Sequence, residues 1–328
     1  MHAVVLHEFG PAENLRYESV EDPKPGPGQV RIAVRAAGVH LIDTGIRAGR
    51  PGGPGPTPVL PMIGGREVAG VVDEVGSDVD ESWRGRRVVA HLGMLSAGYA
   101  ELAVADARSL HALPAGVDDA AAVAMIGTGR TAFAILERAH LSADDVVLIT
   151  SAAGGLGVLL VQAALDAGAI VIGVAGGPEK VEVVRQLGAT VAVDYDQPGW
   201  ADSVRTALDG REISLVLDAV GGVRGRAALE LLGVDGRFLI YGFSSGEPTP
   251  LSVYDLVGRG ITASAAIGAR LLQRPGGFRA LEEAALAALT AGRLVPLLTR
   301  FPLAEAAAAH AALENRQTTG KVVLIPGA

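Results

Sequence analysis

The sequence predicts an α/β protein in which a β-rich domain accompanies a doubly wound parallel sheet. The first observation is length: 328 residues are more than one hydrophobic core usually organises, so we expect two domains. The second is that short β-branched runs fill the first third of the chain. The third is that strand-like and helix-like segments alternate from Val146 onward, which is typical of a parallel sheet covered on both faces.

Four β-branched runs mark the β-rich part, and clusters of turn-forming residues separate them. The runs are VVLHEF (4–9), QVRIAVRAAGV (29–39), REVAGVVDEV (66–75) and RRVVAHLG (86–93). Their short spacing predicts a barrel-like or sandwich-like unit. The Pro- and Gly-rich stretch at 47–61 is too irregular for a strand or a helix. We expect a solvated loop there, with a loop at a substrate entrance as the alternative.

The parallel-sheet part follows a helical segment at 118–141 that a Gly-Thr-Gly sequence interrupts. The expected strands are VVLIT (146–150), IVIGVA (170–175), TVAVD (190–194), ISLVLDAV (213–220) and RFLIYG (237–242). Amphipathic segments of helix length connect these nearly continuous apolar strands, which indicates the doubly wound architecture. After about residue 268 the chain returns to Ala-rich helix, and it ends in a last strand, KVVLIP (321–326).

Charge and cysteine content exclude several classes of function. The net charge of −8 argues against a nucleic-acid surface, because phosphate binding requires concentrated Lys and Arg. The absence of cysteine excludes disulfides, thiolate nucleophiles and Cys-ligated zinc. The N-terminal sequence lacks the apolar segment of a signal peptide, and charges break the longest apolar runs. We therefore expect no membrane span and a cytoplasmic location.

The stretch TSAAGGLGVLLVQ (150–162) carries a glycine motif between a predicted strand and a predicted helix. Ala152, Gly154 and Gly157 stand at the spaced positions of the dinucleotide-binding fingerprint, with alanine at its first glycine. Such a turn lets a pyrophosphate rest on exposed N–H groups and on the positive end of the helix. The alternative is a tight turn without a ligand. The residues that we expect at the site are Ala152, Ala153, Gly154, Gly155, Leu156 and Gly157.

The end of the second strand of this series indicates which dinucleotide binds. An NAD site places an Asp or Glu there for the ribose 2′-hydroxyl. This chain instead has Gly176 and Gly177, which leave room for a 2′-phosphate, and Lys180, which can neutralise it. Glu179 counts against a phosphate unless it points away. We favour NADPH over NADH because the expected acid is missing.

Seven segments make the chain resemble the medium-chain dehydrogenase/reductase superfamily, and in particular its zinc-free quinone oxidoreductase branch, which includes zeta-crystallin. They are AAGVHLID (36–43), GREVAG (65–70), TGRTAF (128–133), SAAGGLG (151–157), VDY (193–195), YGFSSG (241–246) and ENRQTTGKVVLIP (314–326). The resemblance covers nearly the whole length. It implies a GroES-like catalytic domain at 1–120 and 269–328 and a Rossmann domain that binds NADPH at 121–268.

The resemblance also implies roles for six further residues at the cofactor. By similarity, Lys180, Tyr195 and Arg316 match positions around the adenosine 2′-phosphate. Thr131, Phe243 and Ser244 match positions near the nicotinamide. Without the resemblance, we favour strand-end packing for Tyr195 and Phe243, a surface ion pair for Arg316 and a helix-start hydroxyl bonded to its own backbone for Thr131.

The resemblance further implies that catalysis needs no zinc. Zinc-dependent relatives carry a Cys where this chain has His40 and a His where it has Arg66. Arg66 keeps its charge and cannot ligate, and three protein ligands are the usual minimum for a catalytic zinc. We expect Glu67 beside it to pair with neighbours in a structural role. Without a Lewis acid, quinones and α,β-unsaturated carbonyls are favoured, because their reduction delocalises charge.

His40 and Asp43 are the candidate catalytic residues. His40 is the obvious titratable group for donating a proton, since an unperturbed histidine has a pKa of about 6.5. A hydrogen bond to the substrate carbonyl and a packed, non-catalytic ring are the alternatives. Asp43 matches an acidic position of the family, and we expect it to orient a turn rather than to act as a base.

The leading functional hypothesis is therefore an NADPH-dependent reductase of a quinone or a conjugated carbonyl. An enoyl-thioester reductase is the second reading, although segment 38–48 lacks the Tyr that often supplies a proton in such relatives. A nucleotide-binding sensor or structural protein without turnover is the alternative of another class. The resemblance also suggests a homodimer joined through the strand near GITASAAI (260–267).

Overall fold

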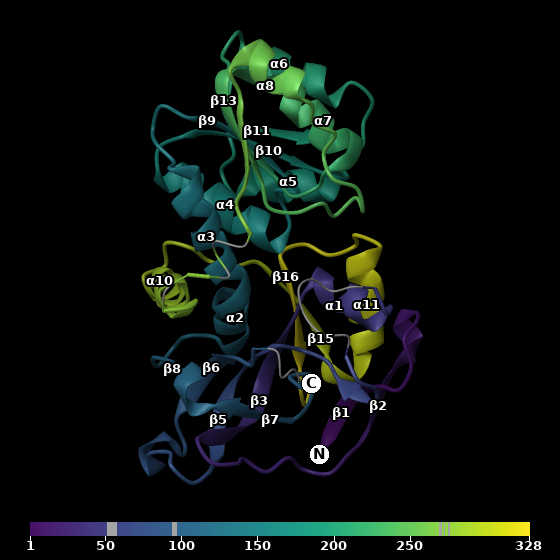
Figure 1. Ribbon diagram of the computed structural model, residues 1–328, viewed down its shortest axis with the longest axis vertical. Coiled ribbons are helices and arrows are strands. Elements are labelled where there is room, and N and C mark those ends of the chain that lie inside the picture. Colours follow the sequence, from purple (N-terminus) through teal and green to yellow (C-terminus); the bar gives the residue numbers. More distant parts are fainter. Residues whose placement is uncertain (51–57, 94–96, 269–270, 272, 275) are drawn as a thin grey trace. The chain divides into compact units, whose positions relative to one another are not determined.

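The computed structural model describes residues 1–328 except 51–57, 94–96, 269–270, 272 and 275. Residues 51–57 of the loop expected at 47–61 therefore lie outside the described residues. Contacts divide the chain into two compact units, each described by itself below (Figure 1). Unit 1 comprises Met1–Gly129, Ala285–Thr290 and Pro296–Ala328, and unit 2 comprises Arg130–Ala284 and Ala291–Val295.

Unit 1 contains two β-sheets. The smaller has the order β2-β1-β4 and the larger the order β15-β16-β3-β5-β6-β8, with β7 pairing β3. The strands are β1 (His2–Leu6), β2 (Leu15–Ser19), β3 (Gln29–Val39), β4 (Met62–Ile63), β5 (Glu67–Val75), β6 (Arg87–His91), β7 (Leu102–Asp106), β8 (Leu110–Ala112), β15 (Leu298–Pro302) and β16 (Lys321–Ile325). Because β3 is the longest strand and pairs with β5, β7 and β16, it organises the unit.

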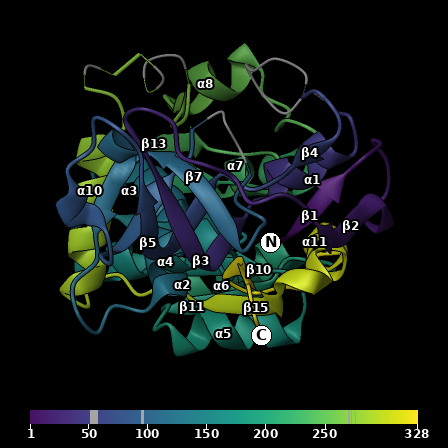
Figure 2. The same cartoon turned by 90° about the horizontal axis from the view of Figure 1, so that it is seen from below.

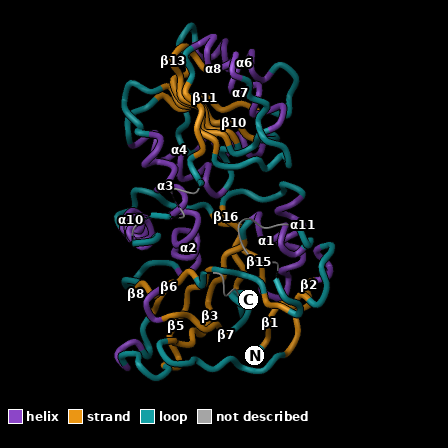
Figure 3. Tube along the Cα trace, viewed as in Figure 1, coloured by secondary structure: helices purple, strands orange, loops and turns teal. Residues whose placement is uncertain are grey.

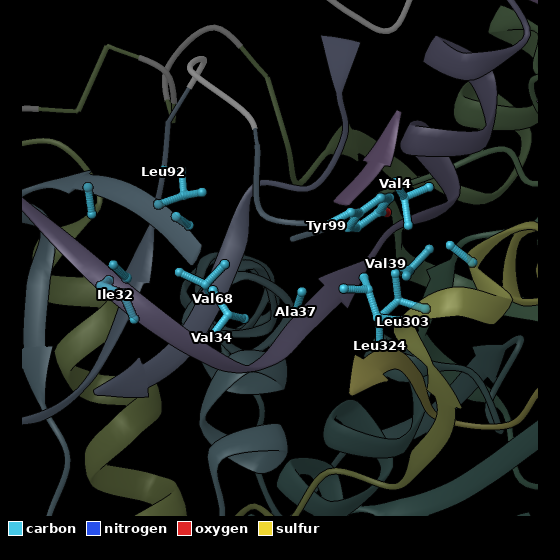
Figure 4. Close-up of a cluster of buried hydrophobic side chains, with 14 of the residues drawn as sticks. Val4, Ile32, Val34, Ala37, Val39, Val68, Leu92, Tyr99, Leu303 and Leu324 are labelled. Carbon is cyan, nitrogen blue, oxygen red and sulfur yellow. The ribbon is translucent and has the colours of Figure 1, made fainter. Parts of the chain in front are cut away.

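Side chains from both sheets of unit 1 share one hydrophobic core. Val4, Ile32, Val39, Val68 and Leu324 are buried in it, as Figure 4 shows. The helices of the unit are α1 (Leu41–Arg47), α2 (Asp119–Ala124) and α11 (Ala306–Glu314). Helix α11 contacts α1 and lies beside β2 (Figure 2). This arrangement brings the start of α1 close to the ends of the central strands.

Unit 2 is a six-stranded parallel sheet with the order β11-β10-β9-β12-β13-β14. The strands are β9 (Val146–Thr150), β10 (Ile170–Ala175), β11 (Val191–Asp194), β12 (Ile213–Asp218), β13 (Leu232–Ile240) and β14 (Thr262–Ala265). The helices are α3 (Arg130–Ala139), α4 (Gly155–Asp166), α5 (Pro178–Gln186), α6 (Trp200–Leu208), α7 (Gly222–Leu231) and α8 (Val253–Arg259). Every residue of β9 is buried, as expected for a central strand with helices on both faces (Figure 3). The predicted fold class, a GroES-like β-rich domain with a Rossmann domain, is confirmed.

The helical segment predicted at 118–141 contains a π-helical turn. Helix α2 continues through a π-helix at Met125–Gly129 into α3, so the Gly-Thr-Gly interruption widens the helix without ending it. By length and composition alone, Asp119–Ala139 could cross a membrane, but 67% of its apolar window is buried inside the fold. A buried core helix has the same composition, and the packing of this one accounts for its apolar sequence.

The bounds of the compact units differ from the domain boundaries expected after residues 120 and 268. Unit 1 extends to Gly129 because Val123 and Ile126 pack into a core cluster with Ala36 and Ala69 of its large sheet. Unit 2 extends to Ala284 because ion pairs hold that segment to α3: Arg130 pairs with Glu282 at 2.9 Å, and Glu137 pairs with Arg274. Helix α10 (Arg279–Thr290) therefore begins in unit 2 and ends in unit 1.

Candidate active site

A cluster of three charged or titratable side chains, His40, Glu67 and Lys321, lies inside unit 1. Nε2 of His40 is 2.5 Å from Oε1 of Glu67. Nζ of Lys321 is 2.7 Å from the same ring nitrogen and 3.1 Å from Oε2 of Glu67. The side chains of Glu67 and Lys321 are 0% and 4% exposed, whereas that of His40 is 27% exposed. His40 is thus the one member of this ion cluster that reaches the surface of the unit.

Strand register explains how three distant positions meet. Strand β3 pairs antiparallel with β16, where Val39 is opposite Val322, and with β5, where Ala37 is opposite Val68. Lys321 begins β16 and Glu67 begins β5, so both lie at the end of β3. His40 follows that end directly and precedes α1. The cluster is therefore a product of sheet pairing and not of any local motif.

Two glycines make the space that the Glu67 carboxylate occupies. A Cβ built on Gly38 would overlap Oε2 of Glu67, and a Cβ built on Gly127 would overlap Oε1. Gly127 lies in the π-helical turn, where it approaches the start of β5. π-Helical turns occur frequently at functional sites. Here the π-helical turn forms part of the space that holds the buried Glu67 carboxylate.

The charges in the cluster keep Glu67 ionised. Burial alone would raise its pKa, but the neighbouring charges of His40 and Lys321, with the hydrogen bond to His40, hold the pKa far below its usual value. Nε2 of His40 can accept a hydrogen bond from Nζ or donate one to Oε1, but a single nitrogen cannot do both at once. Glu67 is therefore the anion of the cluster, and Nε2 of His40 pairs at any one time either with Nζ of Lys321 or with Oε1 of Glu67.

Asp43 fixes the start of α1 and the position of His40. Its Oδ2 accepts a hydrogen bond from the backbone N–H of His40 at 2.8 Å and another from the Tyr99 hydroxyl at 2.9 Å. Burial, followed by the charge of Asp43, raises the pKa of Tyr99 well above its usual value, so this hydroxyl stays protonated. Asp43 is 7% exposed and is occupied by these two donors. Its contacts are those of a positioning group.

In unit 2, the crossover from β9 to α4 spans Ser151–Gly154. Ser151 has a φ of +53°, which is uncommon for a residue with a side chain, and the N–H of Ala152 donates to the carbonyl of Val174. Ala152 and Ala153 are buried, whereas the backbone at Gly154, Gly155 and Leu156 is only partly covered. A Cβ built on Gly157 would overlap the Ser151 carbonyl and lie 2.7 Å from Cα of Ala152. This glycine allows the helix to pack closely on the crossover.

The crossover lies at the point where the strand order of the sheet reverses. β9 is followed by β10 on one side and is flanked by β12 on the other, so the carboxyl ends of β9 and β12 bound the crevice where doubly wound sheets bind ligands. Asp218 at the end of β12 is fully buried and accepts hydrogen bonds from Thr150 at 2.9 Å and Thr249 at 2.7 Å. These bonds hold the two strand ends together beneath the crossover.

The end of β10 carries the residues expected at the adenosine ribose. Helix α5 begins after Gly177, and Lys180 lies half-buried in its first turn. Tyr195 is buried at the end of β11, and the guanidinium of Arg224 stacks on its ring at 4.9 Å. Arg224 also pairs with Asp196. Sequence reasoning did not include Arg224, because it lies in α7, which β12 separates from Tyr195 in sequence, and no local signal marks this position.

The remaining predicted cofactor residues are divided between the units. Thr131 lies half-buried in the first turn of α3, and Phe243 and Ser244 follow β13. The side chain of Phe243 is 60% exposed, and the N–H of Ser244 donates to the carbonyl of Ala219. Arg316 follows α11 with a φ of +57° and belongs to unit 1, whereas the others belong to unit 2. Its proximity to a 2′-phosphate stays a prediction.

Sequence reasoning missed Lys321 and treated Glu67 only as a residue that pairs with neighbours. A signal for Lys321 existed: it is a cation at the start of an otherwise apolar strand, KVVLI, in which Lys321 and the next three residues are buried. Buried lysines almost always have a partner of opposite charge. Among the residues that the structure describes, no group of three His, Cys, Asp and Glu side chains gathers closely enough to hold a metal ion.

Comparison with known proteins agrees with this arrangement. The profile of the alcohol dehydrogenase GroES-like domain matches residues 26–115, and that of the zinc-binding dehydrogenases matches residues 155–286. A 2-haloacrylate reductase of Burkholderia sp is 34% identical over 343 residues, covering 99% of both chains. A quinone oxidoreductase of Pseudomonas aeruginosa is 34% identical over 322 residues, covering 97% of both.

A solved structure supports the same relationship. A mycobacterial protein complexed with NADPH superimposes with a TM-score of 0.84 at 32% identity, covering 99% of this chain and 100% of that chain. Full-length similarity at this level, together with the two domain matches, establishes the family and an oxidoreductase function with a nicotinamide cofactor. The chain belongs to the medium-chain dehydrogenase/reductase superfamily, on its quinone oxidoreductase branch.

Proposed function

We propose that the protein reduces quinones or conjugated carbonyl compounds with NADPH and without a catalytic metal. The observation that carries this proposal is the position of Lys321. Its ammonium lies 2.7 Å from His40 Nε2 and 3.1 Å from Glu67 Oε2, the two ligand-type groups of the cluster. A divalent cation bound there would face a buried positive charge at hydrogen-bond distance. Zinc does not fit these residues, and acceptors that need no Lewis acid are favoured.

The crossover of unit 2 fits the pyrophosphate of a nicotinamide dinucleotide. Helix α4 begins at Gly155 without a side-chain cap, so its first N–H groups are left for an anion. The glycines there allow a ligand to approach the backbone closely. When bound, the cofactor supplies the hydride. The residues of the crossover bind and orient it, and Asp218 keeps the underlying strand ends in place.

The ion cluster of unit 1 supports the proton side of such a reaction. Hydride addition to a quinone or an enone leaves a phenolate or an enolate, and one proton completes the product. His40 is the exposed member of the cluster, and its Nε2 lies at hydrogen-bond distance from the Lys321 ammonium. We propose that His40 donates this proton and that Lys321 returns a proton to Nε2. Asp43 orients His40 through its backbone.

The preference for NADPH rests on the end of β10. No Asp or Glu follows this strand directly, and Lys180, Tyr195 and Arg224 lie at the neighbouring strand and helix ends. A 2′-phosphate is a dianion near neutral pH and suits cationic side chains. Asp196 is the feature that favours NADH, because its carboxylate lies close to Gly176 at the end of β10. A Cβ built on Gly176 would lie 3.3 Å from the carboxyl carbon of Asp196. However, Asp196 forms an ion pair with Arg224, so its negative charge faces a cation.

The experiment that tests the proposal follows NADPH oxidation by the purified protein against quinones, alkenals and enoyl thioesters, before and after treatment with a zinc chelator. We expect turnover with quinones or alkenals and unchanged rates after chelation. Replacing His40 by Gln should lower kcat about 10–100-fold and alter its pH profile. The control, His2→Gln, changes an exposed histidine on β1 and should leave the rates unaltered.

Two outcomes would overturn the proposal. Turnover confined to enoyl thioesters would favour an enoyl-thioester reductase instead. Cofactor binding without oxidation of NADPH by any acceptor would favour a sensor or structural protein.

We further propose a cytoplasmic homodimer joined along β14, because this strand forms an edge of the sheet and its outer backbone groups are available for pairing. Light scattering of the purified protein tests the dimer.

A further inference from the structure

Tyr99 connects the two segments that supply His40 and Glu67 to the ion cluster. It is 1% exposed and lies in the core of unit 1 that Figure 4 shows. The N–H of Val4 in β1 donates to the Tyr99 carbonyl at 2.8 Å, which fixes the backbone of this residue. Its hydroxyl extends toward α1, which begins after His40, and its ring packs on the segment that leads into Glu67.

The Tyr99 hydroxyl belongs to a chain of hydrogen bonds that ends at His40. It donates to Oδ2 of Asp43 at 2.9 Å, and the same oxygen accepts from the backbone N–H of His40 at 2.8 Å. Nε2 of His310 lies 3.3 Å from the Tyr99 oxygen. Because the hydroxyl proton is directed at Asp43, this nitrogen is the donor to Tyr99. The hydroxyl is thus held from two sides, and through Asp43 it holds the backbone of His40.

The Tyr99 ring packs on Gly64 and Gly65. A Cβ built on Gly65 would lie 2.4 Å from the ring, and one built on Gly64 would lie 3.1 Å from it. The N–H of Tyr99 donates to the Gly64 carbonyl at 2.9 Å. Gly65 has a φ of +88°, so the chain turns there before it reaches Glu67. The ring therefore fixes the path of the backbone into Glu67.

A cavity of about 640 Å³ lies beside this network in unit 1. Its lining includes Asp43, Tyr99 and His310, together with the two arginines Arg47 and Arg66. Packing is therefore incomplete on this side of α1, although protein interiors are usually filled by side chains. A buried network whose hydrogen bonds are all made is rigid. The bonds of the Tyr99 hydroxyl thus fix the start of α1 where packing alone does not.

We propose that Tyr99 is a positioning residue for the proton step, which keeps His40 at hydrogen-bond distance from Glu67 and Lys321. The hydroxyl acts on His40 through Asp43, and the ring acts on Glu67 through the two glycines. This inference rests on the proposed function, in which His40 donates the proton. Without the hydroxyl, the start of α1 can shift, and a displacement of about 1 Å at a reacting group can cost about 100-fold in rate.

Kinetics of the variant Tyr99→Phe test the role in the reaction, because this change removes one oxygen and keeps the ring. We expect kcat for NADPH oxidation to fall about tenfold, with KM nearly unchanged. The solvent deuterium isotope effect on kcat should rise, since proton transfer becomes slower. A partly unfolded preparation would lower kcat without changing the isotope effect. The control is Tyr17→Phe, which removes an exposed hydroxyl on β2 and should change neither quantity.

Nuclear magnetic resonance of the ¹⁵N-histidine-labelled protein tests the position of His40 without cofactor or acceptor. The His40 ring is identified by the resonances that His40→Gln removes. Its Nε2 resonance should shift in Tyr99→Phe and stay at the wild-type position in Tyr17→Phe. Asp43→Asn weakens the same link from its other end and should shift the resonance too. If Tyr99 acts through Asp43, adding Tyr99→Phe to Asp43→Asn should lower kcat no further.

The outcomes separate this inference from the proposed function. An Nε2 resonance of His40 that is the same in Tyr99→Phe as in the wild type would overturn the positioning role, as would losses in kcat that multiply in the double variant. If Tyr99→Phe does not fold, a wild-type resonance in Asp43→Asn overturns it equally. A shifted resonance in a protein that reduces no acceptor would leave the contact between Tyr99 and the His40 segment in place and remove the proposed function.

Discussion

The ion cluster of unit 1 and the crossover of unit 2 hold charge by opposite means. The cluster consists of side chains whose positions are up to 281 residues apart in sequence, and each is needed to neutralise the others. The crossover consists of backbone groups within one turn, between Ser151 and Gly157, and its side chains are small so that a ligand can approach. The cluster depends on the charged atoms of its side chains, whereas the crossover depends on the absence of side-chain atoms that would keep a ligand away from the backbone.

This difference sets the kind of change to which each site is sensitive. The cluster is damaged by removing one charge, because the remaining buried charges lose their partners. The crossover is damaged by adding an atom, because the helix and strand are already in contact there. The predictions below test this contrast, beginning with the largest expected effect.

Removing the ammonium of the cluster should have the largest effect on stability. Lys321→Met leaves the Glu67 carboxylate buried beside His40 alone, and breaking a buried ion pair in this way costs about 3–5 kcal/mol. Urea denaturation measures the loss. The double variant Glu67→Gln, Lys321→Met should recover part of it, since no unpaired carboxylate remains. A double variant no more stable than Lys321→Met would contradict the assigned pairing.

The second prediction concerns the pH dependence of stability in unit 1. His310 is 1% exposed and has a pKa lowered to about 4 by burial, with Arg47 also lowering it and Asp43 and Glu314 opposing. Between about pH 6.5 and 4 the unfolded chain binds a proton that the folded chain does not, so stability falls as pH falls through this window. The full shift corresponds to about 3 kcal/mol.

The variant His310→Gln isolates this contribution. It should flatten the dependence of the unfolding free energy on pH between about pH 6.5 and 4, while leaving the slope below pH 4 unchanged. The slope below that window comes from carboxylates with lowered pKa values, among them Glu67. Denaturant titrations at a series of pH values provide the measurement. Parallel curves for wild type and variant would show that the pKa of His310 is not lowered in the folded chain.

Adding one carbon to the crossover should weaken both the fold and cofactor binding. In Gly157→Ala the new Cβ overlaps the Ser151 carbonyl, which forces α4 away from β9. Overpacking of this kind costs about 1–3 kcal/mol, and we expect the affinity for NADPH to fall at least about tenfold. Gly258→Ala in α8 is the control, because nothing lies within 4 Å of its new Cβ. It should leave NADPH affinity unaltered.

The smallest expected effect is on the choice between the two dinucleotides. Lys180→Ala should raise the KM for NADPH about tenfold and leave that for NADH nearly unchanged, because only NADPH carries the 2′-phosphate. Steady-state kinetics with both cofactors measures the ratio. Equal changes in both KM values would remove Lys180 from the phosphate site. The variant Arg224→Gln then shows whether the cation stacked on Tyr195 serves that site instead.

The sequence predicted the features that depend on the local backbone and missed those that depend on contacts between distant side chains. The strands from Val146 onward and the Ala152–Gly157 motif were recognisable because hydrophobic period and turn chemistry are local properties of the chain. His40 and Asp43 were found as candidates, but only as neighbours in one segment. The lysine at the start of the apolar strand KVVLI was a local sign of a buried cation, but no local pattern could reveal its partners in the network around His40 or the cavity with Arg47 and Arg66.

What the sequence determined by itself is the fold class, the order of the two kinds of sheet and the position of the glycine-rich crossover that we propose binds the dinucleotide. Only the tertiary structure decided that Lys321 reaches Glu67, that Gly38 and Gly127 leave space for its carboxylate, and that two arginines face one cavity. The reason is physical. Local patterns depend on residues a few positions apart, whereas buried charges are neutralised by whichever strands the sheet register brings together.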